Sequence, residues 1–384
     1  MKRVCSIAIC LLGLTLACKE QAQEVDYGPA EYTIGIRVKE DTLRLSSLYA
    51  SARQTRLSGC TISHISKVIR TSHGYVLFGK FGDDKNPKLS QVAAFSEDGR
   101  FQQFLVLTGR ANNEMLNVQS VQWNPFTGQV EVLGNYGADI YAFSPSDNWK
   151  LNEVKHVPEG EIQHAEDFIP ETSDRYFFYK NLSYIRAQEY KVYEYDFAGD
   201  SIVNRYIPLD KKKAELLSIS QRNNLYRCGD AVYFTESFDP HIYRFDGQGI
   251  HILAEEERNE YSIPDDFSFR SFGDDLLKFI NTCKSGNFIW NRRNYVHDGD
   301  TILSYFQYKD GVYLNVMDLT SQDSRSFTHI NDDMITNTIA AVSRWSHLFL
   351  NAQDGHCYLI VDESLTEQSD MQDATAGFIL VDLT

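Results

Sequence analysis

Short apolar runs separated by turn residues recur along most of the chain, and residues 225–253 show this pattern most clearly. Two runs rich in tyrosine, valine, isoleucine and phenylalanine, 231–235 and 241–245, stand between clusters of glycine, aspartate and proline. β-Branched and aromatic side chains fit a pleated, half-buried strand, while glycine and aspartate supply the backbone conformations of tight antiparallel turns. The stretch therefore predicts strand, turn, strand, turn and strand.

The same unit recurs at six places, each time as a run of large apolar residues directly after a turn dipeptide. The six runs are residues 75–78, 129–133, 176–179, 231–234, 301–305 and 347–350. Most are followed by a second pair of strand-like runs, and their spacing is close to the ~40–50 residues of a four-stranded propeller blade. We therefore predict an all-β fold, a six-bladed β-propeller with four-stranded antiparallel blades. A β-sandwich is the alternative, but it does not require one motif to recur six times.

The predicted propeller is a single domain that covers residues 31–384. Its last strand-like run is 377–383. Because a closed ring leaves no exposed sheet edge, we expect N- and C-terminal strands to share one blade and close the ring. A charged stretch at 255–280 interrupts the repeat, and we interpret it as a solvated connection or as part of a binding face.

The N-terminus has the pattern of a targeting segment, which we assign to residues 1–17. Lys2 and Arg3 precede an apolar stretch that is shorter than the ~20 residues of a membrane-spanning helix. Residues 14–18, LTLAC, resemble the lipoprotein box of bacterial signal peptides, which implies cleavage before Cys18 and acylation of its thiol and new amine. A plain secretory peptide is the alternative. Residues 18–30 contain few apolar side chains and are interpreted as a tether.

The net charge of the chain limits its possible partners, and the spacing of its cysteines limits the metal and disulfide chemistry that we expect. The whole chain carries a net charge of −16, and an acidic balance of this size argues against nucleic acid as a partner. Four cysteines follow Cys18, at positions 60, 228, 283 and 357, and none has the spacing of a zinc ribbon or a redox pair. We expect buried thiols, although an envelope compartment would also permit a disulfide.

Several local motifs carry a resemblance to a known family. Residues 43–49, LRLSSLY, together with 96–101, SEDGRF, and 307–313, QYKDGVY, resemble the six-bladed β-propeller lipoproteins of Bacteroides-type bacteria, which have an NHL-like architecture. The resemblance implies a lipid-anchored protein of the cell envelope, most simply of the outer membrane, facing the periplasm or the cell surface. Its motifs are structural, so they specify the fold far better than the activity.

The sequence contains no motif for the chemistry of known propeller enzymes. A calcium loop, HExxH, a GxSxG nucleophile elbow and a phosphate loop are all missing from it. We therefore predict no cofactor, and a calcium ion is left open without a supporting motif. The sequence favours a binding protein over an enzyme without deciding between them.

Polar and aromatic residues near the predicted strand starts are candidates for a ligand site at the mouth of the central channel. They are His164, Glu166, Arg222, Arg292, Arg344, Trp123 and Trp345. The imidazole and carboxylate could serve acid and base chemistry, the arginines could bind an anionic or hydroxyl-rich ligand, and the indoles could stack on sugars. The alternatives are a solvated turn, ion pairs with the many carboxylates, and packing between blades.

Three functional classes follow from these features. The leading hypothesis is a non-catalytic envelope lipoprotein that binds a glycan or a protein partner, within a nutrient-uptake system. The second is a propeller hydrolase or lyase that acts on glycans or lactones. The third is a structural platform for the assembly of other proteins.

Overall fold

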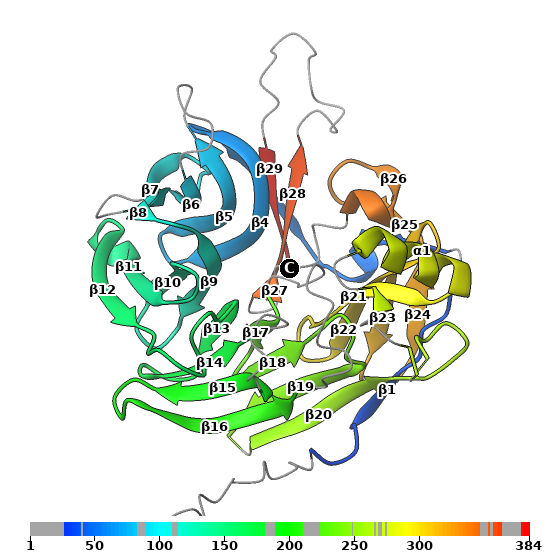
Figure 1. Cartoon of the computed structure of the whole chain (residues 1–384). Coiled ribbons are helices and arrows are strands. Elements are labelled where there is room, and N and C mark those ends of the chain that lie inside the picture. Colours follow the sequence, from blue (N-terminus) through cyan, green and yellow to red (C-terminus); the bar gives the residue numbers. More distant parts are fainter. Residues whose placement is uncertain are drawn as a thin grey trace, which may run out of the picture.

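The computed structural model describes residues 27–39, 41–82, 90–109, 114–180, 189–209, 223–247, 249–264, 266–267, 271–272, 275–345, 352–353, 356–362 and 378–384. Its strands form seven separate sheets that are arranged in a ring around a centre (Figure 1). The all-β propeller fold predicted from the sequence is confirmed, whereas the predicted count of six blades is wrong, because the ring has seven.

Blades 1 to 3 follow one another along the chain, each as consecutive antiparallel strands. Blade 1 contains β4 (Thr61–Thr71), β5 (Gly74–Gly82), β6 (Ser90–Phe95) and β7 (Phe101–Thr108), with the short β8 (Glu114–Met115) parallel to β7. Blade 2 contains β9 (Val118–Asn124), β10 (Gln129–Gly134), β11 (Asp139–Ser144) and β12 (Lys150–His156). Blade 3 contains β13 (Asp167–Pro170), β14 (Arg175–Tyr179), β15 (Tyr190–Asp196) and β16 (Ser201–Pro208).

Blades 4 and 5 repeat this plan. Blade 4 contains β17 (Leu225–Cys228), β18 (Ala231–Thr235), β19 (His241–Asp246) and β20 (Gly249–Glu256), and β1 (Tyr32–Ile34) adds a parallel strand at its outer edge. Blade 5 contains β21 (Ile289–Val296), β22 (Thr301–Tyr308), β23 (Gly311–Asp318) and β24 (Ser324–Phe327). Residues 225–253 were predicted to form three strands separated by two turns, and the structure has four strands there, β17 to β20.

Blades 6 and 7 explain why the sequence suggested six repeats. Blade 6 is the hairpin of β25 (His329–Asp332) and β26 (Thr338–Ala341), completed by the N-terminal β2 (Thr42–Arg44) parallel to β25. Blade 7 contains β27 (Ala352–Gln353), β28 (His356–Asp362) and β29 (Phe378–Leu383), and β3 (Ala52–Leu57) pairs antiparallel with β29. Neither blade draws four consecutive strands from one stretch of sequence. The sixth predicted run, 347–350, lies outside the described residues.

In blades 1 to 4 the first strand lies nearest the centre, and β13 contacts both β9 and β17 (Figure 1). Blade 6 differs, because its β25 lies between β2 and β26. We call the face where the first strand turns into the second the turn face. The opposite face, where one blade leads into the next, is the connection face. The cores lie between adjacent blades, where aromatic pairs such as Phe177 and Phe245 pack with ring centroids 4.7 Å apart.

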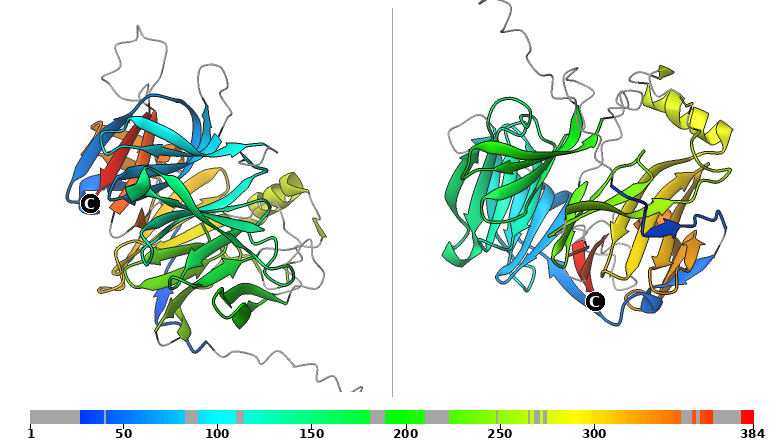
Figure 2. Two further views of the ribbon diagram at one scale, coloured as in Figure 1. Left: turned by 90° about the vertical axis from the view of Figure 1, so that its left-hand side faces the viewer. Right: turned by 90° about the horizontal axis from the view of Figure 1, so that it is seen from below.

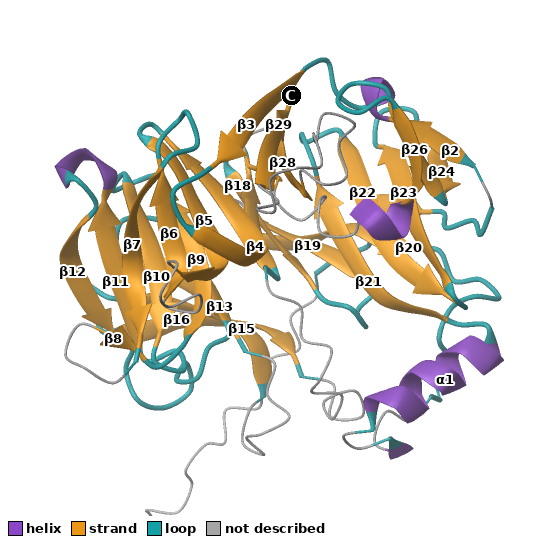
Figure 3. Cartoon of the chain, turned by 90° about the horizontal axis from the view of Figure 1, so that it is seen from above, coloured by secondary structure: helices purple, strands orange, loops and turns teal. Residues whose placement is uncertain are grey.

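The predicted interruption after blade 4 contains one helix, α1 (Leu276–Gly286). The Asp275 side chain caps its N-terminus by accepting a hydrogen bond from the Lys278 amide, and Asn287 ends it in a left-handed conformation. Phe279 is buried in a small satellite core with Trp290, so the insertion is partly packed and not merely a solvated connection. Figures 2 and 3 show α1 at the periphery of the ring. Within the described ranges, no helix is long and apolar enough to cross a membrane.

Candidate functional site

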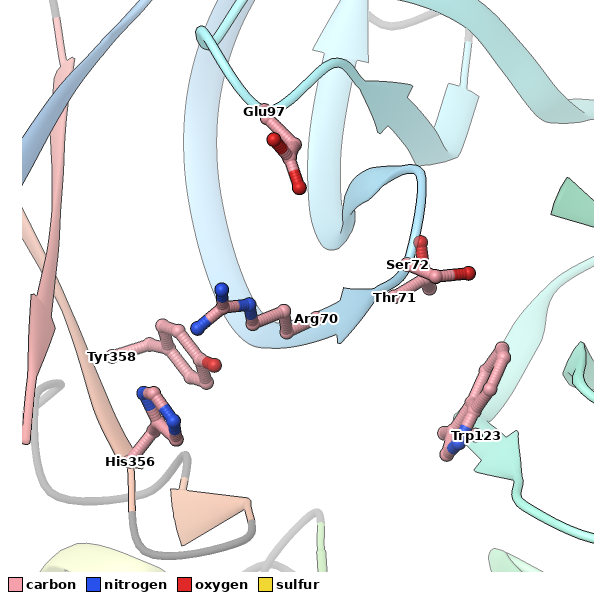
Figure 4. Close-up of a pocket in the computed structure, with 7 residues that line it drawn as sticks. All are labelled: Arg70, Thr71, Ser72, Glu97, Trp123, His356 and Tyr358. Atoms are coloured by element: carbon pink, nitrogen blue, oxygen red, sulfur yellow. The ribbon is translucent and has the colours of Figure 1, made fainter.

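A pocket of about 400 Å³ lies on the turn face, where blades 7, 1 and 2 meet (Figure 4). This volume is typical of small-molecule sites, which span roughly 300–1,000 Å³. The residues that line it are Arg70, Thr71, Ser72, Glu97, Trp123, His356 and Tyr358. They come from the end of β4, the β6–β7 turn, the end of β9 and the start of β28. The pocket is thus assembled from both halves of the sequence.

The turn after β4 holds one side of the pocket in place. The Thr71 hydroxyl donates a hydrogen bond to the Gly74 carbonyl oxygen at 3.1 Å and accepts one from the His73 amide at 3.2 Å. Gly74 has a φ of 125°, and a β-carbon there would collide with the carbonyl oxygen of Phe95. Only glycine suits this turn, which fixes the direction in which the preceding Arg70 leaves the strand.

A buried carboxylate joins the two basic groups of the pocket. Asp382 on β29 is 4% exposed. Its Oδ1 lies 2.6 Å from His356 Nδ1, and its Oδ2 lies 3.1 Å from Arg70 NH1. Because a carboxylate accepts hydrogen bonds, His356 donates through Nδ1, and Nε2 is the ring nitrogen that remains for other partners. The contact links blade 7 to blade 1 and orients both nitrogen groups.

Two aromatic side chains complete the walls. Tyr358 is buried, and its ring is stacked parallel to the His356 imidazole, with centroids 6.0 Å apart. Burial, followed by the charge of Asp382, raises the pKa of Tyr358, so its hydroxyl stays protonated at neutral pH. Trp123 on β9 is half-buried and stands across the pocket from His356 and Tyr358 (Figure 4). The pocket therefore combines an aromatic platform with a cluster of hydrogen-bonding groups on the facing wall.

A polar network crosses the first strands next to this pocket. Lys67 on β4 donates a hydrogen bond to Gln122 Oε1 at 2.9 Å. Burial lowers the pKa of Lys67 to about 8, although the negative charge of Asp167 acts in the opposite direction. Asp167 on β13 accepts hydrogen bonds from the Ser120 hydroxyl at 2.5 Å and from the Leu225 amide at 2.9 Å. The network ties blades 1 to 4 together at the centre of the ring.

A second group of ionisable residues lies on the connection face, between blades 3 and 4. Lys191 forms an ion pair with Glu236, which also accepts a hydrogen bond from the Tyr179 hydroxyl at 3.0 Å. Glu166 lies beside this pair. Burial, and then the charges of Glu236 and Asp167, raise the pKa of Glu166 to about 7. Two carboxyl groups, Glu166 and Glu236, therefore stand close together on this face, and Glu236 is paired with Lys191.

The sequence-predicted site residues are distributed over both faces. Trp123 lines the pocket on the turn face. His164 is exposed with a φ of 65°, and Glu166 is partly buried, both at the connection face before β13. Arg292 on β21 forms an ion pair with Glu256 at the end of β20, which links blades 4 and 5.

The remaining predicted residues cannot be placed around either site. Arg222 and Cys18 lie outside the described residues. Arg344 and Trp345 end the short 3-10 helix η5 (Val342–Trp345), and their side chains are also outside the described part. Sequence reasoning missed Arg70, Glu97, His356 and Tyr358. The alternation of His356 and Tyr358 along one strand was the only available signal, because it places both side chains on one face of a sheet.

Thiols and possible metal ligands can be assessed for the described residues only. Among them, Cys60, Cys228, Cys283 and Cys357 are thiols that form no disulfide with one another. Burial raises the pKa of Cys60, Cys283 and Cys357 to about 12, which suppresses thiolate formation. Among the same residues, no group of three or more histidine, cysteine, aspartate or glutamate side chains is arranged to hold a metal ion.

Comparisons with known proteins establish the fold. No protein-family model and no curated protein sequence matches the chain. A solved structure from Bacteroides fragilis, named as an exported protein, superposes with a TM-score of 0.67 at 10% identity, covering 92% of this chain and 99% of that one. A member of the DUF4221 family from Bacteroides vulgatus gives a TM-score of 0.49 at 10% identity, covering 88% and 97%.

A third structure is an auxiliary nutrient binding protein from Bacteroides thetaiotaomicron. It gives a TM-score of 0.38 at 10% identity and covers 72% of this chain and 64% of its own. Only the Bacteroides fragilis structure is similar enough to support an argument, and at this identity it supports the architecture alone. The chain is a β-propeller that shares its overall fold, over nearly its whole length, with an exported protein of Bacteroides.

Proposed function

We propose that this protein is a non-catalytic envelope lipoprotein, anchored through Cys18, whose propeller binds a ligand in the pocket between blades 7, 1 and 2. The observation that carries the proposal is the pocket itself, where Asp382 holds Arg70 and His356 opposite Trp123. Ligand sites are concave, with a few fixed polar groups and apolar surface, and this pocket has both. The resemblance to Bacteroides-type lipoproteins adds an outer-membrane address and a place in nutrient uptake.

Ring closure is part of this proposal, because Asp382 belongs to β29. Asp382 pairs in register with Arg53 on β3, so the pairing of the N-terminal β3 with the C-terminal β29 supports the strand that carries the pocket carboxylate. We infer that this pairing closes the ring and gives the pocket its rigidity.

The hydrogen bonds of the pocket favour binding over catalysis. His356 and Asp382 form two parts of a nucleophile-activating arrangement, but the third part needs a hydroxyl or thiol within reach of the imidazole. Three lining residues carry a hydroxyl, and burial raises the pKa of the one on Tyr358, which disfavours it as a nucleophile. The other two hydroxyls are engaged in the turn after β4, since Thr71 donates to the Gly74 carbonyl and Ser72 lies 2.9 Å from His73 Nδ1. Both therefore serve the loop that carries them.

A thermal-shift screen tests the proposal. Detergent-extracted full-length protein would be heated with sugars, oligosaccharides, amino acids, peptides and organic acids, in parallel with the Trp123→Ala variant. Because a ligand that binds only the folded state raises its melting temperature, we expect at least one class to stabilise the wild type and not the variant. Equal shifts in both proteins, or no shift with any class, would contradict a ligand site at this pocket.

A second candidate function, a hydrolase or lyase, rests on the pair Glu166 and Glu236. A carboxyl group with a pKa of about 7 beside a carboxylate held by Lys191 is an arrangement that can donate and accept protons at neutral pH. Glycan or lactone turnover that is lost in Glu166→Gln and kept in Trp123→Ala would favour this function. Partner capture without small-molecule binding would instead favour an assembly platform.

A further inference from the structure

We infer that the pocket between blades 7, 1 and 2 takes a neutral sugar ring that presents two adjacent hydroxyl groups. The inference rests on the proposed function, because it names the ligand class of the same site. Three independent properties of the pocket support it: the mixture of donors and acceptors on one wall, the aromatic platform opposite, and the balance of charge.

The wall of blades 7 and 1 presents a donor and an acceptor at a fixed separation. The guanidinium of Arg70 can only donate hydrogen bonds. His356 donates through Nδ1 to Asp382, so its Nε2 accepts when the ring is neutral. Both groups bind the same carboxylate, at 3.1 and 2.6 Å, which restricts their movement relative to each other.

Hydroxyl groups match this pairing better than other polar groups. Each hydroxyl both donates and accepts, so one can donate to His356 Nε2 while its neighbour accepts from Arg70. A carboxylate or phosphate could use only the donor, and an ammonium group only the acceptor. Two adjacent hydroxyls on a ring satisfy both partners at once from two positions, whereas an isolated alcohol could do so only if both partners lay within hydrogen-bond reach of one oxygen.

The opposite wall supplies the apolar contact that a sugar ring requires. Trp123 stands across the pocket from His356 and Tyr358, and part of its surface is open to solvent (Figure 4). One face of a pyranose ring carries mainly C–H groups, while its hydroxyls project from the rim. A ring stacked on the indole would therefore direct its rim hydroxyls toward Arg70 and His356. Aromatic side chains bind such amphipathic surfaces with little loss of conformational freedom.

The charge of the pocket disfavours an anionic ligand. Arg70 is the only cationic side chain among the lining residues, and the buried Asp382 balances its charge. Glu97, in the β6–β7 turn, adds an exposed carboxylate at the rim. The formal charges of Arg70, Asp382 and Glu97 sum to one negative charge. The whole chain is also acidic, with a net charge of −16, so its electrostatic field would repel a uronic acid or a phosphate.

The test uses a glycan array that contains neutral oligosaccharides and matched oligosaccharides with uronic acids, followed by calorimetry with the strongest binder. The probe protein is the detergent-extracted full-length chain. We expect neutral glycans to bind best, with an affinity that changes less than about twofold when the salt concentration is raised roughly tenfold. Trp123→Ala should weaken binding roughly tenfold, and Trp123→Phe should keep most of the affinity.

A matched control comes from the same blade. Phe126 is an exposed aromatic residue three positions after Trp123, outside the pocket lining, and Phe126→Ala should bind like the wild type. The melting temperature of each variant without ligand would show whether it is folded like the wild type.

The outcomes separate this inference from the proposed function. A uronate or organic acid that binds best, and loses affinity in Trp123→Ala, would overturn the neutral sugar and leave the pocket as the binding site. Glycan binding that is equally strong in wild type, Trp123→Ala and His356→Ala would overturn the pocket as the site, and with it the proposed function.

Discussion

Asp382 accepts a hydrogen bond from His356 Nδ1 at 2.6 Å, across the two neighbouring strands β28 and β29. The same carboxylate binds Arg70, which lies 312 positions earlier in the chain. Because blade 7 contributes the carboxylate and blade 1 the guanidinium, one buried side chain both joins two blades and shapes the pocket between them.

Removing this carboxylate should cost stability. Asp382→Ala leaves Arg70 and His356 without their shared acceptor, and we expect the free energy of unfolding to fall by about 1–3 kcal/mol. Asp382→Asn keeps one acceptor oxygen and should lose less. Denaturant unfolding measures both. As a control, Lys284→Met removes an ion pair to a 91% exposed aspartate, Asp310, and should leave the unfolding midpoint unchanged. Equal stability of Asp382→Ala and wild type would contradict the structural role.

Glu166 should make the protein less stable as the pH rises. Its pKa is about 7 in the folded chain against an ordinary value of 4.5, so the folded state holds the proton more tightly than the unfolded state. Its contribution is complete below about pH 4.5 and is lost between about pH 4.5 and 7. Glu166→Gln cannot titrate and should be more stable than wild type above pH 7, by up to about 3 kcal/mol.

Unfolding free energies measured at several pH values check this prediction. Burial, and then the charge of Glu194, raise the pKa of Glu171 to about 7, so the Glu166→Gln variant will retain a pH dependence in the same window. The difference in unfolding free energy between wild type and Glu166→Gln, taken at each pH, therefore reports the contribution of Glu166 alone. Parallel stability curves for the two proteins would show that Glu166 titrates normally.

Ring closure is tested by deleting residues 376–384. The deletion removes β29 and exposes the edges of β28 and β3, which are both hydrogen-bonded to it. Since unpaired strand edges promote aggregation, we expect a sharply lower melting temperature and aggregation on heating. An unchanged melting temperature would mean that β29 is dispensable and that the ring is held closed elsewhere.

The membrane anchor is tested by Cys18→Ala. Lipid attachment requires the Cys18 thiol, so the variant should leave the membrane fraction and appear in the soluble envelope fraction, while wild type requires detergent. A variant that still requires detergent would contradict the assignment of Cys18 as the acylated residue.

Local sequence patterns predicted those parts of the fold that are local in sequence. The runs in 225–253 became β17 to β20 because apolar alternation and turn residues act between neighbouring strands. Blades 6 and 7 were not predicted because each includes an N-terminal strand, β2 or β3, that pairs with residues about 290 to 330 positions later in the chain. No periodicity in one stretch records such a pairing.

The candidate site was harder to predict than the fold. Trp123 was identified as an aromatic residue near a predicted strand start, a property visible in its local sequence. The local sequences around Arg70, His356 and Asp382 carry no such signal. These residues come together only because blades 7 and 1 are neighbours in the folded chain. Arg292 had the same local pattern as a ligand-binding arginine, but it pairs with Glu256 of the adjacent blade.

The most direct test of the account compares the two faces of the ring in one binding titration. The best ligand from the screen would be titrated calorimetrically into wild type, Trp123→Ala on the turn face and Glu166→Gln on the connection face. The account predicts that affinity falls roughly tenfold in Trp123→Ala and stays at the wild-type value in Glu166→Gln. Wild-type affinity in Trp123→Ala together with lost affinity in Glu166→Gln would place the site on the connection face and contradict the account.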